Sequence, residues 1–364
     1  MRLLEYFHSK IKNRYFRTMI LLRKVLFPFA ILYGFITSLR NYLYDKGILK
    51  SYSFGIPIIA VGNLSVGGTG KTPQIEYLIR LLSPKYKVAT LSRGYKRKSE
   101  GFILADADVT AEIVGDEPFQ YYKKFPNIQV SVDADRKNGI EQLLNQEKKP
   151  DIILLDDAYQ HRKVKAGFYI LLTSYGDLFS DDFMLPTGNL RESRNGAIRA
   201  NVIIVTKCPS DITIAEQETI SQKLVDFVPQ ENSSVKVFFS TVSYDDKVYN
   251  DLGSLSVIKV KSTPKLLLAG IAKPKPFFDY LKSDIDQILS FSDHHHFSES
   301  EISSIKNKAN NKIIITTEKD FVRLNAKILK EQLFYLPIKS EFLDSKEAFD
   351  QTILNYVGTC TRNR

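Results

Sequence analysis

Short runs of aliphatic and β-branched residues alternate with longer amphipathic segments along most of this chain. Such runs are typical of strands buried on both faces, and several of the segments between them are long enough for crossover helices. We therefore predict an α/β fold built on a mostly parallel sheet that helices cover on both faces. The predicted strands of this first set are residues 56–62, 87–92, 128–132, 151–155, 168–173 and 201–206.

A second set of apolar runs follows, and it predicts a smaller α/β lobe at the C-terminus. Polar residues at 209–217 and 230–234 separate the two sets. We predict an N-terminal helical segment over residues 1–50, a core over 51–225 and the smaller lobe over 226–364. The strands of the smaller lobe are expected near residues 235–242, 265–269, 312–316 and 333–336, with helices between them.

The N-terminal segment contains an uncharged apolar stretch, residues 25–39, between Lys24 and Arg40. A helix that crosses a bilayer needs about 20 apolar residues, so this stretch is too short to span one. Its cationic flanks and its aromatic residues suit a helix that lies in the membrane interface. We therefore predict a membrane-surface helix, and a buried core helix of the same length is the alternative.

Composition narrows the classes of function without choosing one. The 364 residues carry 51 Lys and Arg against 41 Asp and Glu, and this formal net charge of +10 favours an anionic partner. Nucleic acid, a nucleotide and an acidic lipid all fit that description. The two cysteines, Cys208 and Cys360, exclude a disulfide framework and favour a reducing compartment.

A glycine-rich loop follows the first predicted core strand and opens a helix. Its sequence is typical of P-loop NTPases, in which backbone N–H groups and the helix N-terminus bind phosphate. Lys71 can reach the β- and γ-phosphates of a nucleotide, and Thr72 can ligate Mg²⁺. The general motif has glycine where this chain has Ser65. The residues predicted to bind the cofactor are Ser65, Val66, Gly67, Gly68, Thr69, Gly70, Lys71 and Thr72.

Two carboxylates, Asp156 and Asp157, come directly after the apolar run at 151–155. One of them can hold Mg²⁺ directly or through water, while the other orients water or a neighbouring side chain. A turn that begins with Asp is the simpler alternative. The segment 206–209 resembles a guanine-recognition element but has Pro209 in place of the aspartate, so we expect ATP with Mg²⁺.

Four other places carry candidate chemistry, each with a simpler structural alternative. Asp116 can act as a base toward a substrate hydroxyl or cap a helix. Arg136 suits a γ-phosphate or an anionic substrate, and equally a solvated helix start. Arg191 can clamp phosphate and Glu192 can join the metal shell, although an ordinary loop explains both. One histidine of residues 294–296 can pair with a carboxylate in catalysis, and a polar turn is the alternative.

The ordered combination of these motifs resembles one family, the tetraacyldisaccharide 4′-kinases of lipid A biosynthesis. The matching elements extend from the N-terminal helix almost to the C-terminus. The last of them, Thr317 to Asp320, also fits a threonine helix cap with acidic residues in the first turn. The elements are residues 61–73, Ser92-Arg93-Gly94-Tyr95, Gly115-Asp116-Glu117-Pro118, Asp156-Asp157, Gln160-His161, Leu190-Arg191-Glu192, Asp293-His294-His295 and Thr317-Glu318-Lys319-Asp320.

This resemblance implies an activity and a location. The activity is ATP-dependent phosphorylation of the 4′-hydroxyl of an acylated disaccharide 1-phosphate, which gives lipid IVA in a Gram-negative bacterium. Withdrawing acyl chains from a bilayer costs about 0.8 kcal/mol per CH₂, so the enzyme is expected to meet its substrate at the membrane. We expect a peripheral or monotopic monomer at the cytoplasmic face of the inner membrane.

The resemblance also implies roles for the candidate residues. Asp116 is the implied base, supported by His294. Lys71, Thr72 and an acid of the 156–157 pair are implied to handle Mg-ATP. The remaining clamp is implied to be Arg136, Arg191 and Glu192.

Two other classes of protein fit parts of the sequence. A membrane-surface ATPase switch carries an additional lysine early in the phosphate loop, where this chain has Val66. Such a switch would also leave the Asp116 and His294 clusters without a task. A nucleic-acid-binding NTPase is suggested only by the basic charge, and the sequence contains no recognition module. We therefore expect no nucleic-acid partner.

Overall fold

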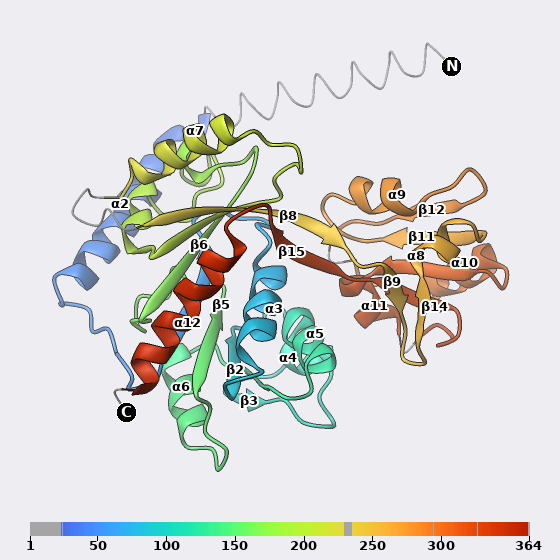
Figure 1. Cartoon of the computed structure of the whole chain (residues 1–364), viewed down its shortest axis with the longest axis horizontal. Coiled ribbons are helices and arrows are strands. Elements are labelled where there is room, and N and C mark those ends of the chain that lie inside the picture. Colours follow the sequence, from blue (N-terminus) through green and yellow to red (C-terminus); the bar gives the residue numbers. More distant parts are fainter. Residues whose placement is uncertain (1–22, 24, 229–234, 294, 326, 363–364) are drawn as a thin grey trace.

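The computed structural model of the chain describes residues 23, 25–228, 235–293, 295–325 and 327–362, and its two sheets lie side by side (Figure 1). The strands of the larger sheet are β1 (Ile58–Asn63), β2 (Val88–Ser92), β3 (Ile103–Leu104), β4 (Gln129–Val132), β5 (Ile152–Asp156), β6 (Phe168–Ser174), β7 (Val202–Thr206), β8 (Lys236–Tyr244) and β15 (Ile338–Phe342). The helices around it are α2 (Phe27–Asp45), α3 (Lys71–Leu82), α4 (Ala111–Val114), α5 (Asp116–Lys124), α6 (Arg136–Leu144), α7 (Ile214–Val225) and α12 (Lys346–Arg362).

The larger sheet has the strand order β15-β8-β7-β6-β1-β5-β2-β4-β3. Its pairs are parallel except at the two edges, where β3–β4 and β15–β8 are antiparallel. Both faces are covered, because α3, α5 and α12 pack on one face while α6 and α7 pack on the other. The predicted α/β fold with a mostly parallel sheet is therefore confirmed, as is the predicted position of each strand in the first set.

The smaller sheet has the strand order β10-β9-β14-β13-β11-β12. Its strands are β9 (Lys247–Tyr249), β10 (Ser254–Ser256), β11 (Lys265–Ala269), β12 (Gln287–Ser290), β13 (Ile313–Thr317) and β14 (Leu333–Leu336). The helices that cover it are α8 (Val257–Lys261), α9 (Lys275–Leu281), α10 (Glu299–Ala309) and α11 (Glu318–Leu324). Apolar residues of α8 and α9 fill the core on one face, and those of α10 and α11 fill it on the other.

The two sheets do not divide at residue 226, where the sequence analysis placed the start of the smaller lobe. Strand β8 pairs with β7, and β15 pairs with β8, so both belong to the larger sheet together with α12. Phe238, Phe342 and Phe349 share one buried cluster with the central strands, which explains this placement. The smaller sheet therefore lies between residues 247 and 336. The sequence pattern missed β3, β9 and β10 because strands of two or three residues show no periodicity.

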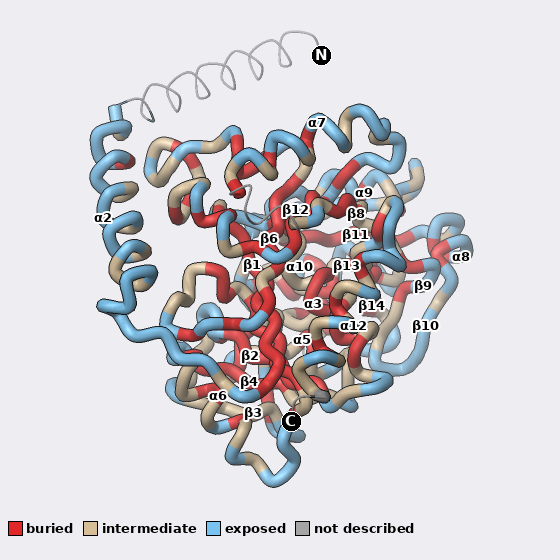
Figure 2. Tube along the Cα trace, turned by 60° about the vertical axis from the view of Figure 1, so that its left-hand side comes forward, coloured by how far each residue is buried: buried red, intermediate tan, exposed pale blue. Residues whose placement is uncertain are grey.

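Helix α2 lies along one side of the larger lobe and leaves much of its surface exposed (Figure 2). Ala30 is its one fully buried residue. The exposed apolar side chains are Phe27, Phe29, Ile31, Leu32, Phe35, Ile36, Leu39 and Tyr42. Within the described ranges, no helix has both the length and the apolar character needed to cross a membrane. Because most apolar side chains of α2 are exposed, the alternative of a buried core helix is wrong. Residues 1–22 and 24 of the predicted N-terminal segment lie outside the described residues.

The carboxyl ends of the central parallel strands meet at one edge of the larger sheet, where ligands bind in open α/β folds. Strand β1 leads there into the phosphate loop and α3. Its neighbours β5 and β6 end beside it, and β7 ends on the far side of β6. Gly62, near the end of β1, has no room for a side chain, because a Cβ there would lie 2.7 Å from the Cβ of Tyr159. This close packing fixes the direction in which the loop leaves the sheet.

Candidate active site

The phosphate loop connects β1 to α3 in the way that the sequence predicts. Gly70 adopts φ 83° directly before Lys71, the first residue of α3, and this left-handed conformation favours glycine. The loop is held from outside: the Val66 N–H donates to the carbonyl of Asn189 at 2.7 Å, and the Thr206 hydroxyl donates to the carbonyl of Thr69 at 2.8 Å. The start of α3 therefore presents backbone N–H groups and positive potential to an anion.

Asp157 joins the two cationic side chains that the sequence analysis singled out. It lies just past β5 at φ 47°, and its carboxylate is 3.6 Å from Lys71 Nζ and 3.0 Å from the Arg191 guanidinium. Although burial acts in the opposite direction, these two cations hold the pKa of Asp157 below its usual value. Side chains from three separate segments of the chain thus meet beside the phosphate loop.

Asp156 ends β5, and its side chain is buried. One carboxylate oxygen accepts hydrogen bonds from the hydroxyls of Tyr121 at 3.2 Å and Ser92 at 3.4 Å. The other, Oδ1, has no hydrogen-bond partner among the described residues. Burial, with the charge of Asp157, raises the pKa of Asp156 to about 6. Buried polar atoms usually have a partner, and Mg²⁺ is bound in proteins by oxygen atoms such as those of carboxylates. The Oδ1 atom of Asp156 therefore fits a Mg²⁺ ligand.

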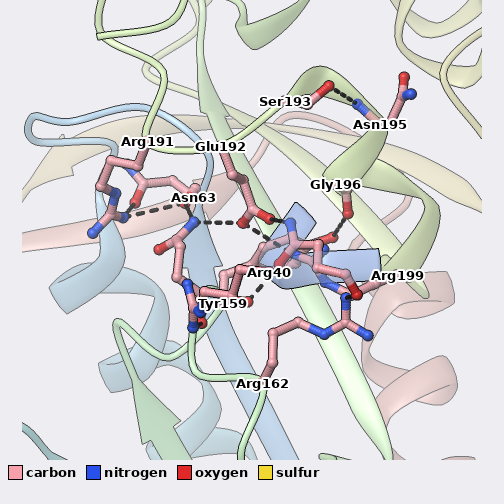
Figure 3. A network of polar contacts seen from close by, with 12 residues as sticks. Arg40, Asn63, Tyr159, Arg162, Arg191, Glu192, Ser193, Asn195, Gly196 and Arg199 are labelled. Atoms are coloured by element: carbon pink, nitrogen blue, oxygen red, sulfur yellow. Dashed lines mark hydrogen bonds and ion pairs between the residues drawn. The ribbon is translucent and has the colours of Figure 1, made fainter. Parts of the chain in front are cut away.

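Asn63, the last residue of β1, is a site residue that the sequence analysis did not identify. Its side-chain oxygen lies 3.5 Å from Lys71 Nζ and accepts a hydrogen bond from Arg191. Its backbone carbonyl accepts from Arg191 at 3.1 Å and from Gln160 at 2.7 Å (Figure 3). A buried polar residue that ends an apolar strand directly before the phosphate loop was the available signal.

Lys207 is a second residue that the sequence analysis passed over, since the segment 206–209 was considered only for guanine recognition. It follows β7 at φ 59°, and its Nζ donates a hydrogen bond to the carbonyl of Gly68 in the phosphate loop. Burial, with the nearby charge of Lys273, lowers the pKa of Lys207. It brings a further cation to the phosphate loop.

Glu192, which the sequence analysis placed in the metal shell, is buried among protein hydrogen-bond donors. It is 3% exposed, and both carboxylate oxygens accept hydrogen bonds from the protein (Figure 3). Oε1 accepts from Arg199 at 2.8 Å and from Gln160 at 2.9 Å, and Oε2 accepts from Asn41 at 3.0 Å. These partners satisfy the buried charge, so Glu192 holds the loop after β6 against α2 and against the turn after β5.

Arg136 is also placed differently from expectation. The side chain is buried at the start of α6, where it donates to the backbone carbonyls of Asp133 and Asp156, the latter at 3.2 Å. Burial lowers the pKa of Arg136 to about 10. In this position Arg136 supports the backbone that carries Asp156, and its guanidinium is not presented to solvent for direct contact with a phosphate.

Asp116 is the first residue of α5 and faces the smaller lobe. Gly115 precedes it at φ 95°. The Asp116 carboxylate forms an ion pair with Arg323 of α11, and the next residue, Glu117, pairs with Lys319 at 3.0 Å. The expected partner His294 lies outside the described residues. In the described part of the chain no three His, Cys, Asp or Glu side chains gather as a metal site.

Helix α2 is tied to the loop that carries Arg191. The Tyr33 hydroxyl donates to the backbone carbonyl of Arg191 at 2.9 Å. Arg40 donates to the carbonyl of Gln160 at 2.8 Å, and Asn41 reaches Glu192 as described above. The helix that exposes the apolar side chains therefore contacts the site directly.

Comparisons with known proteins agree on one family. The family described as Tetraacyldisaccharide-1-P 4′-kinase matches residues 22–358. A tetraacyldisaccharide 4′-kinase of Flavobacterium psychrophilum is 67% identical over 342 residues, covering 94% of this chain and 99% of the relative. That of Bacteroides thetaiotaomicron is 45% identical over 366 residues, covering 94% and 95%. The crystal structure of the "apo" form of LpxK from Aquifex aeolicus in complex with ATP has TM-score 0.73 and 30% identity, covering 92% and 99%.

Proposed function

The chain belongs to the tetraacyldisaccharide 4′-kinase family, and on this premise we propose how its own residues carry out phosphoryl transfer. It is an ATP-dependent kinase of lipid A biosynthesis. The observation that carries the residue assignment is the convergence of Lys71, Arg191 and Asp157 beside the phosphate loop. The proposed acceptor is the 4′-hydroxyl of a tetraacyldisaccharide 1-phosphate, which becomes lipid IVA.

The phosphate loop and Lys71 bind the phosphates of ATP in this proposal. The transition state of phosphoryl transfer is loose, so positioning and neutralisation of charge supply most of the acceleration. Lys71 neutralises charge on the β- and γ-phosphates, and Arg191 clamps the transferred group. Asn63 contacts both cations: its side-chain oxygen lies 3.5 Å from Lys71 Nζ, and its backbone carbonyl accepts from Arg191 at 3.1 Å.

The Mg²⁺ that accompanies ATP neutralises charge on the phosphates when it is bound. The residues proposed to hold it are Thr72, Asp156 and Asp157. The buried Oδ1 of Asp156, which lacks a protein partner in the described residues, supports this assignment. Glu192 is left out because its carboxylate is already occupied.

Asp116 is proposed as the base that orients the 4′-hydroxyl and accepts its proton late in the reaction, with His294 in support. The position of Asp116 at the contact between the lobes agrees with an acceptor that enters from there. The exposed apolar side chains of α2 support binding to a membrane surface, where an acylated substrate resides. We place the enzyme, as a monomer, at the cytoplasmic face of the inner membrane.

The experiment that tests this proposal is transfer of labelled phosphate from ATP to purified disaccharide 1-phosphate in detergent micelles. A positioned base contributes about 10²–10⁴-fold, so Asp116→Asn should lower kcat by that order while ATP affinity is unchanged. Lys71→Ala should weaken ATP binding as well as turnover. Exposed Asp108 and Lys149 provide matched controls as Asp108→Asn and Lys149→Ala, which should behave as wild type.

Three results would overturn the proposal. Equal loss of ATP affinity in Asp116→Asn and Lys71→Ala would contradict the division of roles. Full activity of Asp116→Asn would remove it as the base. ATP hydrolysis stimulated by bare liposomes, without phosphorylated lipid, would favour a membrane-surface switch instead.

A further inference from the structure

An ion pair between the two lobes holds the carboxylate that the proposed function uses as its base. We propose that Arg323, on α11 of the smaller lobe, is a positioning residue that fixes the Asp116 carboxylate for the phosphoryl-transfer step. The inference rests on the proposed role of Asp116. It assigns a task to α11, whose first turn the sequence analysis gave as a matching element of the family and as a capped helix start.

The contact between α5 and α11 consists of three ionic contacts in sequence along the helices. Asp116 pairs with Arg323, Glu117 pairs with Lys319 at 3.0 Å, and Lys124 pairs with Glu318 at 2.7 Å. The first residue of α5 thus meets the last turn of α11, and the last residue of α5 meets the first turn. This antiparallel arrangement brings a residue of the smaller lobe to the base, although 207 positions separate the two in sequence.

Arg323 is itself held in place by its own lobe. Asp320, which is fully buried, lies 3.6 Å from the Arg323 guanidinium. The same carboxylate accepts hydrogen bonds from the N–H of Gly270 at 2.8 Å and from the hydroxyl of Thr317 at 2.7 Å. Since Gly270 directly follows β11 and Thr317 ends β13, the carboxylate beside the guanidinium is fixed to the core of the smaller sheet.

The pair is shielded enough for its electrostatics to matter. Arg323 is 11% exposed and Asp116 is 22% exposed. Interactions between such partly buried charges are screened by salt much less than those of surface pairs. Other charged groups of the described residues at this contact include Lys319 and Asp320 from α11 and Glu117 from α5.

One effect on the reaction follows from this arrangement. A carboxylate fixed by a guanidinium loses rotational freedom before the substrate arrives, which keeps it within reach of the hydroxyl proton. This effect requires α11 to lie against α5, so the base is in position only when the lobes are in contact.

Arg323→Met and Arg323→Lys test the inference in the full-length enzyme, with Lys319→Met as the control. Lys319→Met removes a neighbouring cation of the same helix and a second ion pair of the same lobe contact. Misplacement of a reacting group by about 1 Å costs on the order of 100-fold, so Arg323→Met should lower kcat by roughly 10–100-fold. ATP affinity should stay unchanged, and Arg323→Lys should recover part of the loss.

The split between kcat and KM separates positioning from mere attachment of the lobes. Arg323→Met should lower kcat while the KM for ATP stays within about twofold of wild type, because only the base is misplaced. Lys319→Met should keep kcat within about threefold of wild type, because a partly exposed ion pair contributes little.

The outcomes distinguish this inference from the proposed function. If Asp116→Asn is inactive while Arg323→Met has wild-type kcat, Arg323 does not position the base. Equal losses in Arg323→Met and Lys319→Met would show that both residues only join the lobes. If Asp116→Asn is fully active, the base assignment itself fails, whatever Arg323→Met does.

Discussion

Lys124, the last residue of α5, is buried between two carboxylates from different parts of the molecule. Its Nζ lies 2.7 Å from Glu76 of α3 and 2.7 Å from Glu318 of α11. Glu76 is 1% exposed and Glu318 is 8% exposed, so both charges depend on protein partners. Glu76 keeps Arg80 and Gln120 as partners if Lys124 is removed, whereas Glu318 keeps only the N–H of Ile338 at 3.4 Å.

Lys124→Met should therefore destabilise the protein mainly through Glu318. Removing one partner of a buried ion pair costs about 3–5 kcal/mol because the other charge is left uncompensated. We expect a loss at the lower end, about 3 kcal/mol, because Glu318 can take up a proton. Glu318→Gln in the Lys124→Met background should recover more than half of it, since the uncompensated charge is then gone.

The pH dependence of this loss has a definite sign. Burial, with the charge of Glu76, raises the pKa of Glu318 from 4.5 to about 7 in the folded protein. The folded state therefore binds this proton more tightly, and the contribution of Glu318 to stability is present below pH 4.5 and is lost as pH rises to about 7. Without Lys124 the pKa of Glu318 rises further, so the destabilisation should be larger at about pH 8 than at about pH 5.

Urea unfolding across that pH range measures the effect. Lys98→Met is the control, because Lys98 forms a 2.8 Å pair with Glu112 in which the two side chains are 75% and 70% exposed. Loss of such an exposed pair should leave the free energy of unfolding nearly unchanged. A loss of less than 1 kcal/mol in Lys124→Met at about pH 8, or a larger loss at about pH 5, would refute the reasoning.

Three further predictions concern the site and α2. Because the pKa of Asp156 is about 6, a proton competes with Mg²⁺ for this carboxylate. The Mg²⁺ concentration for half-maximal activity should therefore rise about tenfold as the pH falls from about 7 to about 5. An unchanged Mg²⁺ requirement would exclude Asp156 as a ligand. Asn41→Leu removes a donor to buried Glu192, and should lower the free energy of unfolding by about 1.5 kcal/mol in urea, while no change would deny that this bond matters. Phe29→Ser with Phe35→Ser should reduce cosedimentation with liposomes but preserve activity in micelles, and undiminished cosedimentation would argue against α2 as the membrane contact.

The sequence by itself determined the features that local patterns encode. Apolar runs identified the central strands, and the glycine loop after β1 identified the phosphate site. Both signals are contained in one short stretch of the sequence, so they can be recognised without the rest of the fold. Asp156 and Asp157 were found because they end an apolar run. The ordered motifs were specific enough to indicate the family that the comparisons establish.

Only the tertiary structure decided which partners each charged side chain meets. The sequence pattern suggested Glu192 as a metal ligand, but in the structure its carboxylate accepts a hydrogen bond from Asn41, 151 positions away. The sequence pattern suggested Arg136 as a phosphate contact, but in the structure it is buried at the start of α6 and donates to the backbone carbonyl of Asp156. Arg323 carries no motif, and it becomes important because α11 packs on α5. A charged residue has the same local pattern whether it faces a ligand or another side chain, so its partner is fixed by packing between distant segments and not by the residues beside it.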